Sequence, residues 1–277
     1  MRSSFCLALF ASNLLAAAPS SVVVWSDEFD KPGFPDSTRW SYETGGDGMG
    51  NKEAELYTGK RASNAWVSDG LLRITARRED TGTCWYGPCK FTSARLVSRG
   101  KAEWLYGKVE VRAKLTRGVG LWPAIWMLGA TKTYGGWPAQ GEIDIMENVG
   151  FDSSTVFGTV HTEAYNHKIG TSKGSTTLAD SFHVYSLDWR PDSLFVGFDG
   201  KNFFKFKNEG NWQAWPFDKP MYMILNVAVG GEWGGQKGVD TSVFPQTMEI
   251  DWVRVSKVAT SPGPFSVQVR ASQGGHV

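Results

Sequence analysis

Short stretches of alternating apolar and polar residues recur along the chain, and turn-forming residues separate them. Residues 65–77 (AWVSDGLLRITAR) and 194–206 (LFVGFDGKNFFKF) each carry an Asp-Gly pair between two apolar runs. This arrangement is typical of a tight β-hairpin, because Asp-Gly tolerates the positive φ of its turn. Further strands are predicted at residues 108–115, 182–189, 221–229 and 247–255, and no long run has a helical period. About a dozen strands with Gly-rich connections predict an all-β, two-sheet antiparallel sandwich.

The two ends of the chain differ in composition from the part between them. Residues 1–18 combine Arg2, a short apolar run and Ala16-Ala17-Ala18, which is typical of a secretory signal peptide cut near residue 18. The apolar run is too short to span a bilayer. Residues 259–277 are rich in Pro, Gly and Ser at their start and end and are expected to form a tail, although FSVQV within them could pair as an edge strand. One catalytic domain is therefore expected over residues 19–258, and the protein is expected to be secreted.

The cysteines and charges limit the classes of partner. Cys6 would leave with the signal peptide, and the remaining Cys84 and Cys89 are expected to form a disulfide that closes a short loop. The formal net charge is +1, and no basic stripe is present, so neither a nucleic acid nor a membrane surface is expected as a partner. The 13 tryptophans hint at carbohydrate, because indoles stack on sugar rings, although large aromatic side chains also fill sandwich cores.

Three acids stand close together in residues 141–150, GEIDIMENVG. If this segment is a strand, Glu142 and Asp144 share a face and Glu147 points to the other, because side chains alternate. Glu147 joins the other two only if Met146 adds one extra residue, which would make a β-bulge. The stretch alone leaves this open, since Glu147 could instead mark the end of the strand.

The segment just before the acids, LWPAIWML, places indoles on the same face as the carboxylates. As a strand it turns Trp122 and Trp126 to one side and Ile125 and Met127 to the other. The apolar residues belong against a second sheet. Exposed indoles beside acids are costly unless a ligand covers them, so this face is interpreted as the floor of an open cleft. The alternative, an ordinary solvated acidic face, does not account for the neighbouring tryptophans.

Paired carboxylates on a cleft floor suit the cleavage of a glycosidic bond. One carboxylate attacks the sugar and one carboxylic acid protonates the leaving oxygen, and retaining enzymes hold the two about 5–5.5 Å apart. Neighbouring carboxylates cannot all ionise cheaply, so one pKa rises. Glu142 is predicted to be the nucleophile, Glu147 the protonated acid, and Asp144 a hydrogen-bonding partner of the nucleophile.

Four segments together resemble family 16 of the glycoside hydrolases, in particular its laminarinase-type endo-β-1,3-glucanases. They are GEIDIMENVG, LWPAIWML, GTVHTEAYNH and LNVAVGGEWGG, and the resemblance runs from about residue 25 to residue 255. It implies a β-jelly roll bent around an open substrate cleft, retaining hydrolysis by Glu142 and Glu147 with help from Asp144, and no cofactor for the chemistry. It also implies a β-glucan polysaccharide as substrate, and we expect a monomer.

The resemblance further implies a set of substrate-binding residues. Asn51 would contact sugar on the non-reducing side of the cut, and Trp233 would stack further out in the cleft. For two members an ordinary structural role remains possible: His161 as a hydrogen-bonded core histidine and Arg95 as a surface charge. The whole set is Asn51, Arg95, Trp122, Trp126, Trp137, His161 and Trp233.

Three features depart from the pattern of the family. Lys52 and Glu232 stand where relatives often have Asn, and the segment CWYGPC is an insertion in a loop expected near the cleft. These departures leave the fine specificity for substrate open. Many family members also hold a structural calcium ion away from the cleft, so the resemblance allows for one here. The matching positions are Glu28, Gly70 and Asp251, with backbone carbonyls supplying much of the shell.

The expected function is therefore a secreted endo-β-1,3-glucanase, and activity on mixed β-1,3/1,4-glucans as well stays open. Two alternatives share the fold: a β-glucan-recognition protein without catalysis, and a transglycosylase or a hydrolase of another polysaccharide. The presence of both glutamates disfavours the first alternative, and the lack of extra basic residues in the predicted cleft disfavours sulfated galactans.

Overall fold

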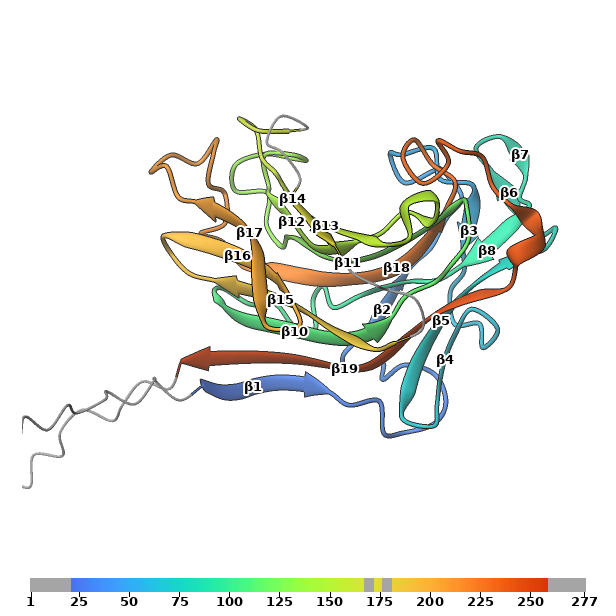
Figure 1. Cartoon of the computed structure of the whole chain (residues 1–277), viewed down its shortest axis with the longest axis horizontal. Helices are drawn as coiled ribbons and strands as arrows, with labels where there is room; N and C mark the ends of the chain where they lie inside the picture. The colour runs from blue at the N-terminus through green and yellow to red at the C-terminus, as the bar shows by residue number, and fades with distance from the viewer. Residues whose placement is uncertain (1–20, 167–171, 176–180, 259–277) are drawn as a thin grey trace, which may run out of the picture.

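The computed structural model describes residues 21–166, 172–175 and 181–258. Two large β-sheets lie face to face, and the seven-stranded sheet is strongly curved (Figure 1). Short 3-10 helices η1 (Gly150–Asp152) and η2 (Thr241–Val243) are the only helical elements among these residues, and none is long and apolar enough to cross a membrane. The predicted signal peptide, tail and FSVQV strand lie outside the described residues.

The seven-stranded sheet carries the concave face. Its strands pair antiparallel in the order β14 (Ser172–Ser175), β13 (Thr155–His161), β12 (Glu142–Glu147), β11 (Leu121–Gly129), β18 (Met221–Val229), β9 (Arg95–Val97) and β2 (Ser41–Glu43).

The ten-stranded sheet covers its back. Its main order is β17 (Lys201–Lys207), β16 (Ser193–Phe198), β15 (His183–Trp189), β10 (Gly107–Lys114), β19 (Gln246–Val258), β5 (Leu71–Arg78), β8 (Phe91–Ser93) and β3 (Glu55–Tyr57). In addition, β1 (Ser21–Asp27) pairs with β19 and β4 (Ala65–Ser68) with β5. The pairing of β3 with β8 is parallel and departs from the predicted antiparallel pattern.

The predicted alternation produces the core between the sheets. In β10, Val109, Val111 and Ala113 are buried while their neighbours are partly exposed. In β11, Ile125 and Met127 are fully buried in the same core, as predicted. Burial of such side chains contributes about 25 cal/mol per Å² of apolar surface, so this alternating pattern fixes which face of each strand points inward.

Both Asp-Gly turns connect hairpins as predicted. Asp69 and Gly70 join β4 to β5 with φ of 54° and 73°, and Asp199 and Gly200 join β16 to β17 with φ of 45° and 77°. Both residues of each turn thus have the positive φ that a tight hairpin requires.

The disulfide between Cys84 and Cys89 is confirmed. It closes a small hairpin of β6 (Thr83–Cys84) and β7 (Gly87–Pro88). The hairpin packs on the loop that precedes β3, since the Trp85 indole N–H donates to the Glu53 carbonyl (2.8 Å) and the Tyr86 hydroxyl to that of Ala54 (2.6 Å).

Candidate active site

The β-bulge in β12 is present. Asp144 pairs with Trp126 of β11, whereas Met146 pairs with the next residue along, Ile125, so one residue of β12 has no partner. That residue is Ile145 rather than Met146. Ile145 and Met146 are both fully buried in the core between the sheets. Two consecutive residues therefore point inward, and Glu147 turns to the concave face beside Glu142.

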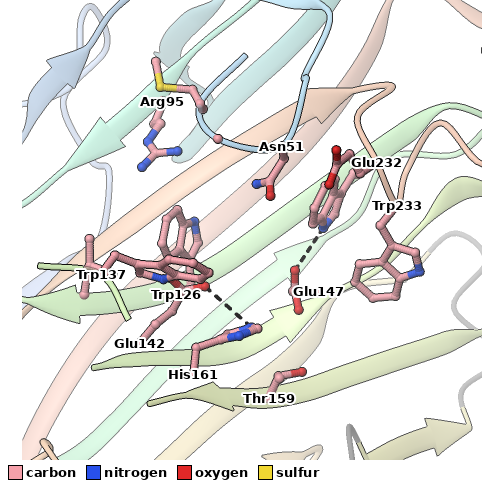
Figure 2. A pocket seen from close by; sticks show the side chains of 14 residues that line it. Asn51, Arg95, Trp126, Trp137, Glu142, Glu147, Thr159, His161, Glu232 and Trp233 are labelled. Carbon is pink, nitrogen blue, oxygen red and sulfur yellow. Dashed lines mark hydrogen bonds and ion pairs between the residues drawn. The ribbon is translucent and has the colours of Figure 1, made fainter. Parts of the chain in front are cut away.

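Glu142 and Glu147 lie on the floor of a cleft of about 570 Å³, and the buried Asp144 borders a small cavity that continues this floor. Figure 2 shows Arg95 and Asn51 on one side of the cleft, Thr159 and His161 on the opposite side, and Glu142 and Glu147 between them. All seven residues predicted to bind substrate line this cleft: Asn51, Arg95, Trp122, Trp126, Trp137, His161 and Trp233.

Each of the two glutamates accepts a hydrogen bond from an indole. The Trp137 N–H donates to Glu142 Oε2 at 2.7 Å, and the Trp122 N–H donates to Glu147 Oε1 at 3.0 Å. Burial is the main cause that raises the pKa of both carboxyls above the usual range, and the charge of Asp144 adds to it. For Glu147 the charge of Glu142 raises the pKa further.

His161 supplies a positive charge to the acids. Its Nε2 lies 3.4 Å from Asp144 Oδ2 and 3.9 Å from Glu142 Oε1, and its Nδ1 lies 3.1 Å from Asn166 Oδ1. Burial alone would lower the pKa of His161, but the hydrogen bond and charge of Asp144 outweigh it and raise the pKa to about 10. His161 is therefore a charged member of the site and not a core histidine.

These neighbours distinguish the two glutamates. The positive charges of His161 and Arg95 and the hydrogen bond from Trp137 all favour ionised Glu142. Glu147 has the Trp122 bond and the His161 charge in its favour, but it also faces the charge of Glu142. Burial foremost, and then the charge of Asp144, raise the pKa of Glu142 to about 8, and the pKa of Glu147 is raised well above its usual value with the charge of Glu142 as an added cause. These neighbours favour loss of the proton from Glu142 before Glu147, which is the order that acid–base chemistry at a glycosidic bond needs.

Arg95 is not a surface charge. It is buried in β9, donates from Nε to Glu43 Oε2 at 2.7 Å, and places its guanidinium 4.7 Å from the centre of the Trp126 ring. A cation over an indole face is attracted by the ring quadrupole. Arg95 thus holds Trp126 against the cleft floor as well as lining it.

Lys52 and Glu232, the two residues that stand where relatives often have Asn, contact each other. Lys52 Nζ lies 2.9 Å from a Glu232 carboxylate oxygen, and the Glu232 backbone N–H donates to the Asn51 carbonyl at 2.7 Å. An exposed ion pair contributes little stability, but together with the backbone bond it links the loop that carries Asn51 to the loop that carries Trp233. These two loops form one wall of the cleft.

Several residues that line the cleft were not predicted. Thr159 stands two residues before His161 on β13, so strand alternation would have placed it on the same face. Glu53 and Asn226 border a small cavity that continues the cleft floor beside Glu142 and Glu147. Nothing in the local sequence marks these two residues, because their place depends on contacts between distant segments.

The residues predicted to hold calcium lie at one junction of the fold. β5 and β1 pair with successive parts of β19, with Leu72 opposite Ile250 and Asp27 opposite Val253. The backbones of Glu28, Gly70 and Asp251 therefore approach one another there. However, the Glu28 carboxylate pairs with Arg254 and that of Asp251 with Arg112, so the two carboxylates already face cations. A cation at this junction would depend on backbone carbonyls.

The family model described as glycosyl hydrolases family 16 matches residues 52–254. A beta-glucanase of Rhodothermus marinus is 49% identical over 250 residues, which cover 86% of each chain. The X-ray structure of the laminarinase from Rhodothermus marinus matches with a TM-score of 0.83 at 46% identity, over 88% of this chain and 100% of that one. A glucan endo-1,3-beta-glucosidase of Cryptopygus antarcticus is 38% identical, over 84% of this chain and 91% of the relative.

Proposed function

Since the chain belongs to glycosyl hydrolase family 16, we propose that it is a retaining endo-β-1,3-glucanase that hydrolyses laminarin-like polymers and also mixed β-1,3/1,4-glucans. One observation carries the proposal. The bulge in β12 brings Glu142 and Glu147 to the same face of the cleft, and each accepts a hydrogen bond from an indole. The names of the similar glucanases support β-glucan as the substrate class.

The reaction proceeds in two displacements. In the first, the Glu142 carboxylate attacks the anomeric carbon while Glu147 gives its proton to the departing glycosidic oxygen. A covalent glycosyl–enzyme intermediate forms. In the second, Glu147, now a carboxylate, takes a proton from water, and the resulting hydroxide displaces Glu142. The anomeric configuration is retained, and both glutamates return to their starting states.

Asp144 and His161 support this cycle without bonding to the sugar carbon. The positive charge of His161 lies 3.4 Å from Asp144 and 3.9 Å from Glu142, so it offsets the repulsion between the two carboxylates. Trp137 orients Glu142 through its 2.7 Å bond. The indoles of Trp126 and Trp233 offer apolar faces to sugar rings, while Asn51 and Arg95 offer polar groups to hydroxyls.

The direct test measures reducing ends released from laminarin by the wild type and by Glu142→Gln and Glu147→Gln. Each substitution is expected to lower kcat by at least about a hundredfold, since each removes one of the two groups that the chemistry requires. Glu103→Gln, a change in an exposed loop that does not line the cleft, serves as control. If Glu142→Gln cuts as fast as the wild type, the assignment fails.

The products separate this proposal from its alternatives. Proton NMR during hydrolysis should show the β-anomer first, as retention requires. Products longer than the starting oligosaccharide would indicate transglycosylation, and tight glucan binding without any product would indicate a recognition protein. Laminarin, lichenan and curdlan, compared side by side, report the preference for linkage.

The proposal includes secretion after cleavage near residue 18, a monomeric catalytic domain over residues 19–258 and a tail over 259–277. It also includes a structural calcium ion at the junction of Glu28, Gly70 and Asp251, held mainly by backbone carbonyls. The mass of the secreted protein reports the cleavage site, and light scattering reports the oligomeric state. If Tm is the same in calcium and in EDTA, the protein does not bind a structural calcium ion at this junction.

A further inference from the structure

A hydrogen-bonded chain of side chains runs beneath one wall of the cleft. We refer to the buried relay as Glu53, Tyr57 and Asn226. The Tyr57 hydroxyl donates to Glu53 Oε2 at 2.9 Å and accepts from Asn226 Nδ2 at 2.9 Å. All three side chains are buried, with exposures of 4%, 1% and 4%. The segments that carry them are far apart in sequence, because Tyr57 lies on β3 and Asn226 on β18.

Each end of the buried relay holds a residue that lines the cleft. At one end, Asn51 Nδ2 donates to Glu53 Oε1 at 3.2 Å. At the other, the Trp126 indole N–H donates to Asn226 Oδ1 at 2.8 Å. Asn51 belongs to the cleft wall and Trp126 to the cleft floor, on the side marked by Arg95 in Figure 2. The buried relay is thus a continuous polar connection between two surfaces that a sugar would touch.

The direction of the hydrogen bonds determines which groups of Asn51 and Trp126 remain available to a sugar. The bonds run from Trp126 to Asn226, from Asn226 to Tyr57 and from Tyr57 to Glu53, so the Glu53 carboxylate is the acceptor at the end of the chain. Because the Asn51 side-chain amide donates to Glu53, its side-chain carbonyl oxygen remains as the acceptor for a sugar hydroxyl. Because the Trp126 indole N–H donates to Asn226, Trp126 offers only its ring face to a sugar. Burial foremost, and then the charges of Glu53 and Glu55, raise the pKa of Tyr57, which keeps its hydroxyl a donor.

We propose that Glu53, Tyr57 and Asn226 are positioning residues for substrate binding: the buried relay sets Asn51 and Trp126 in register with each other for a β-glucan chain. None of the three takes part in bond cleavage. The inference rests on the proposed function for the identity of the glucan. A linked set of this kind is more rigid than separate contacts, because each bond polarises the next and each broken bond leaves a buried polar group without a partner.

Tyr57→Phe is the sharpest change, because it removes one buried oxygen and keeps the ring. The Glu53 carboxylate and the Asn226 amide each lose a bond. We expect KM for laminarin to rise about fivefold or more while kcat changes less than about twofold. The dissociation constant for a laminarin oligosaccharide, measured by calorimetry, should rise by the same factor. Glu53→Gln, which keeps the volume but changes an acceptor to a donor, should act in the same direction and covers the case in which Tyr57→Phe does not fold.

The chain offers a matched control. Tyr185 is also fully buried, but its hydroxyl has no hydrogen-bond partner, and it lies on β15, toward the opposite edge of the ten-stranded sheet from β3. Tyr185→Phe should leave KM and the oligosaccharide affinity unchanged. If Tyr57→Phe lowers Tm but leaves both quantities at the wild-type value, the three residues have only a structural role and the inference is overturned.

A double-mutant cycle tests whether the effect passes through Asn51. If the buried relay acts by orienting Asn51, Tyr57→Phe should have a smaller effect in the Asn51→Ala background than in the wild type. Full additivity would overturn this part of the inference. The wild type separates a failure of the proposed function from a failure of the role proposed for the buried relay. A wild type that binds the oligosaccharide but does not cut laminarin contradicts the proposed function alone. A wild type that neither binds nor cuts contradicts both.

Discussion

At the scale of single residues, the contacts of His161 show how one cation organises the site. Nε2 faces Asp144 and Glu142, and Nδ1 faces the Asn166 side-chain oxygen. Both ring nitrogens therefore have acceptors, which stabilises the doubly protonated ring. The pKa of His161, raised to about 10, keeps this charge across the neutral range.

The first prediction concerns the replacement of this charge. The His161 charge lowers the pKa of Glu142, whereas burial and Asp144 raise it. His161→Gln therefore leaves the pKa of Glu142 higher than in the wild type, and a higher pH is needed to ionise the nucleophile. The acidic limb of the kcat/KM profile should move to higher pH, and kcat/KM at pH 6 should fall at least about tenfold. His183→Gln, on β15 and away from the cleft, should leave the profile in place. An unmoved acidic limb in His161→Gln would contradict the assigned role.

At the scale of the strand, β12 shows what the sequence could and could not predict. Alternation correctly predicted which faces of β11 and β12 are buried, because apolar burial is encoded locally. Alternation alone placed Glu147 on the wrong face, and the extra residue that corrects this was predicted only as one of two possibilities. Arg95 is buried where β9 pairs with β18, and there it lies opposite Asn226. Tyr57 also accepts a hydrogen bond from Asn226. Each of these contacts joins residues more than a hundred positions apart in the sequence. No local pattern reports such contacts.

The second prediction concerns Glu55 in β3. Its side chain is buried at 1% exposure, Oε2 accepts from the Val229 N–H at 2.7 Å, and Oε1 has no hydrogen-bond partner. Burial foremost, and then the charge of Glu53, raise the pKa of Glu55 well above that of the unfolded chain. The folded protein thus keeps a proton that the unfolded chain releases. This contribution to stability is complete below about pH 4.3 and is lost as the pH rises toward the folded-state pKa.

Glu55→Gln removes this titration and keeps the acceptor for Val229. The gain in Tm over the wild type should therefore be larger at pH 8 than at pH 5, which thermal unfolding at both values would show. Exposed Glu163→Gln serves as the control and should give the same difference at both pH values. A gain for Glu55→Gln that is independent of pH would show that burial does not hold the proton on this side chain.

At the scale of the whole molecule, the two sheets divide the work. The concave sheet carries the three acids, and the ten-stranded sheet lies behind it (Figure 1) and completes the core. The ten-stranded sheet also contributes to the cleft, because the loop before β3 carries Asn51. The loops before β3 and after β18 form one wall of the cleft, linked by Lys52 and Glu232 and supported by the disulfide hairpin. Substitutions in the wall should therefore change the preference for substrate, while those in β12 should change the rate of cleavage.

The pairing of β1 with β19 sets Ser21 opposite Val258. The order of the strands along the chain can consequently be rearranged without changing their places in space. In a circular permutant of residues 21–258, a short glycine-rich linker would join Val258 to Ser21, and the new ends would lie at Gly210 in an exposed loop. This permutant should fold and hydrolyse laminarin with kcat/KM within about threefold of the domain in its original order. An insoluble or inactive permutant would show that the order of synthesis, and not only the final set of contacts, is needed to assemble the two sheets.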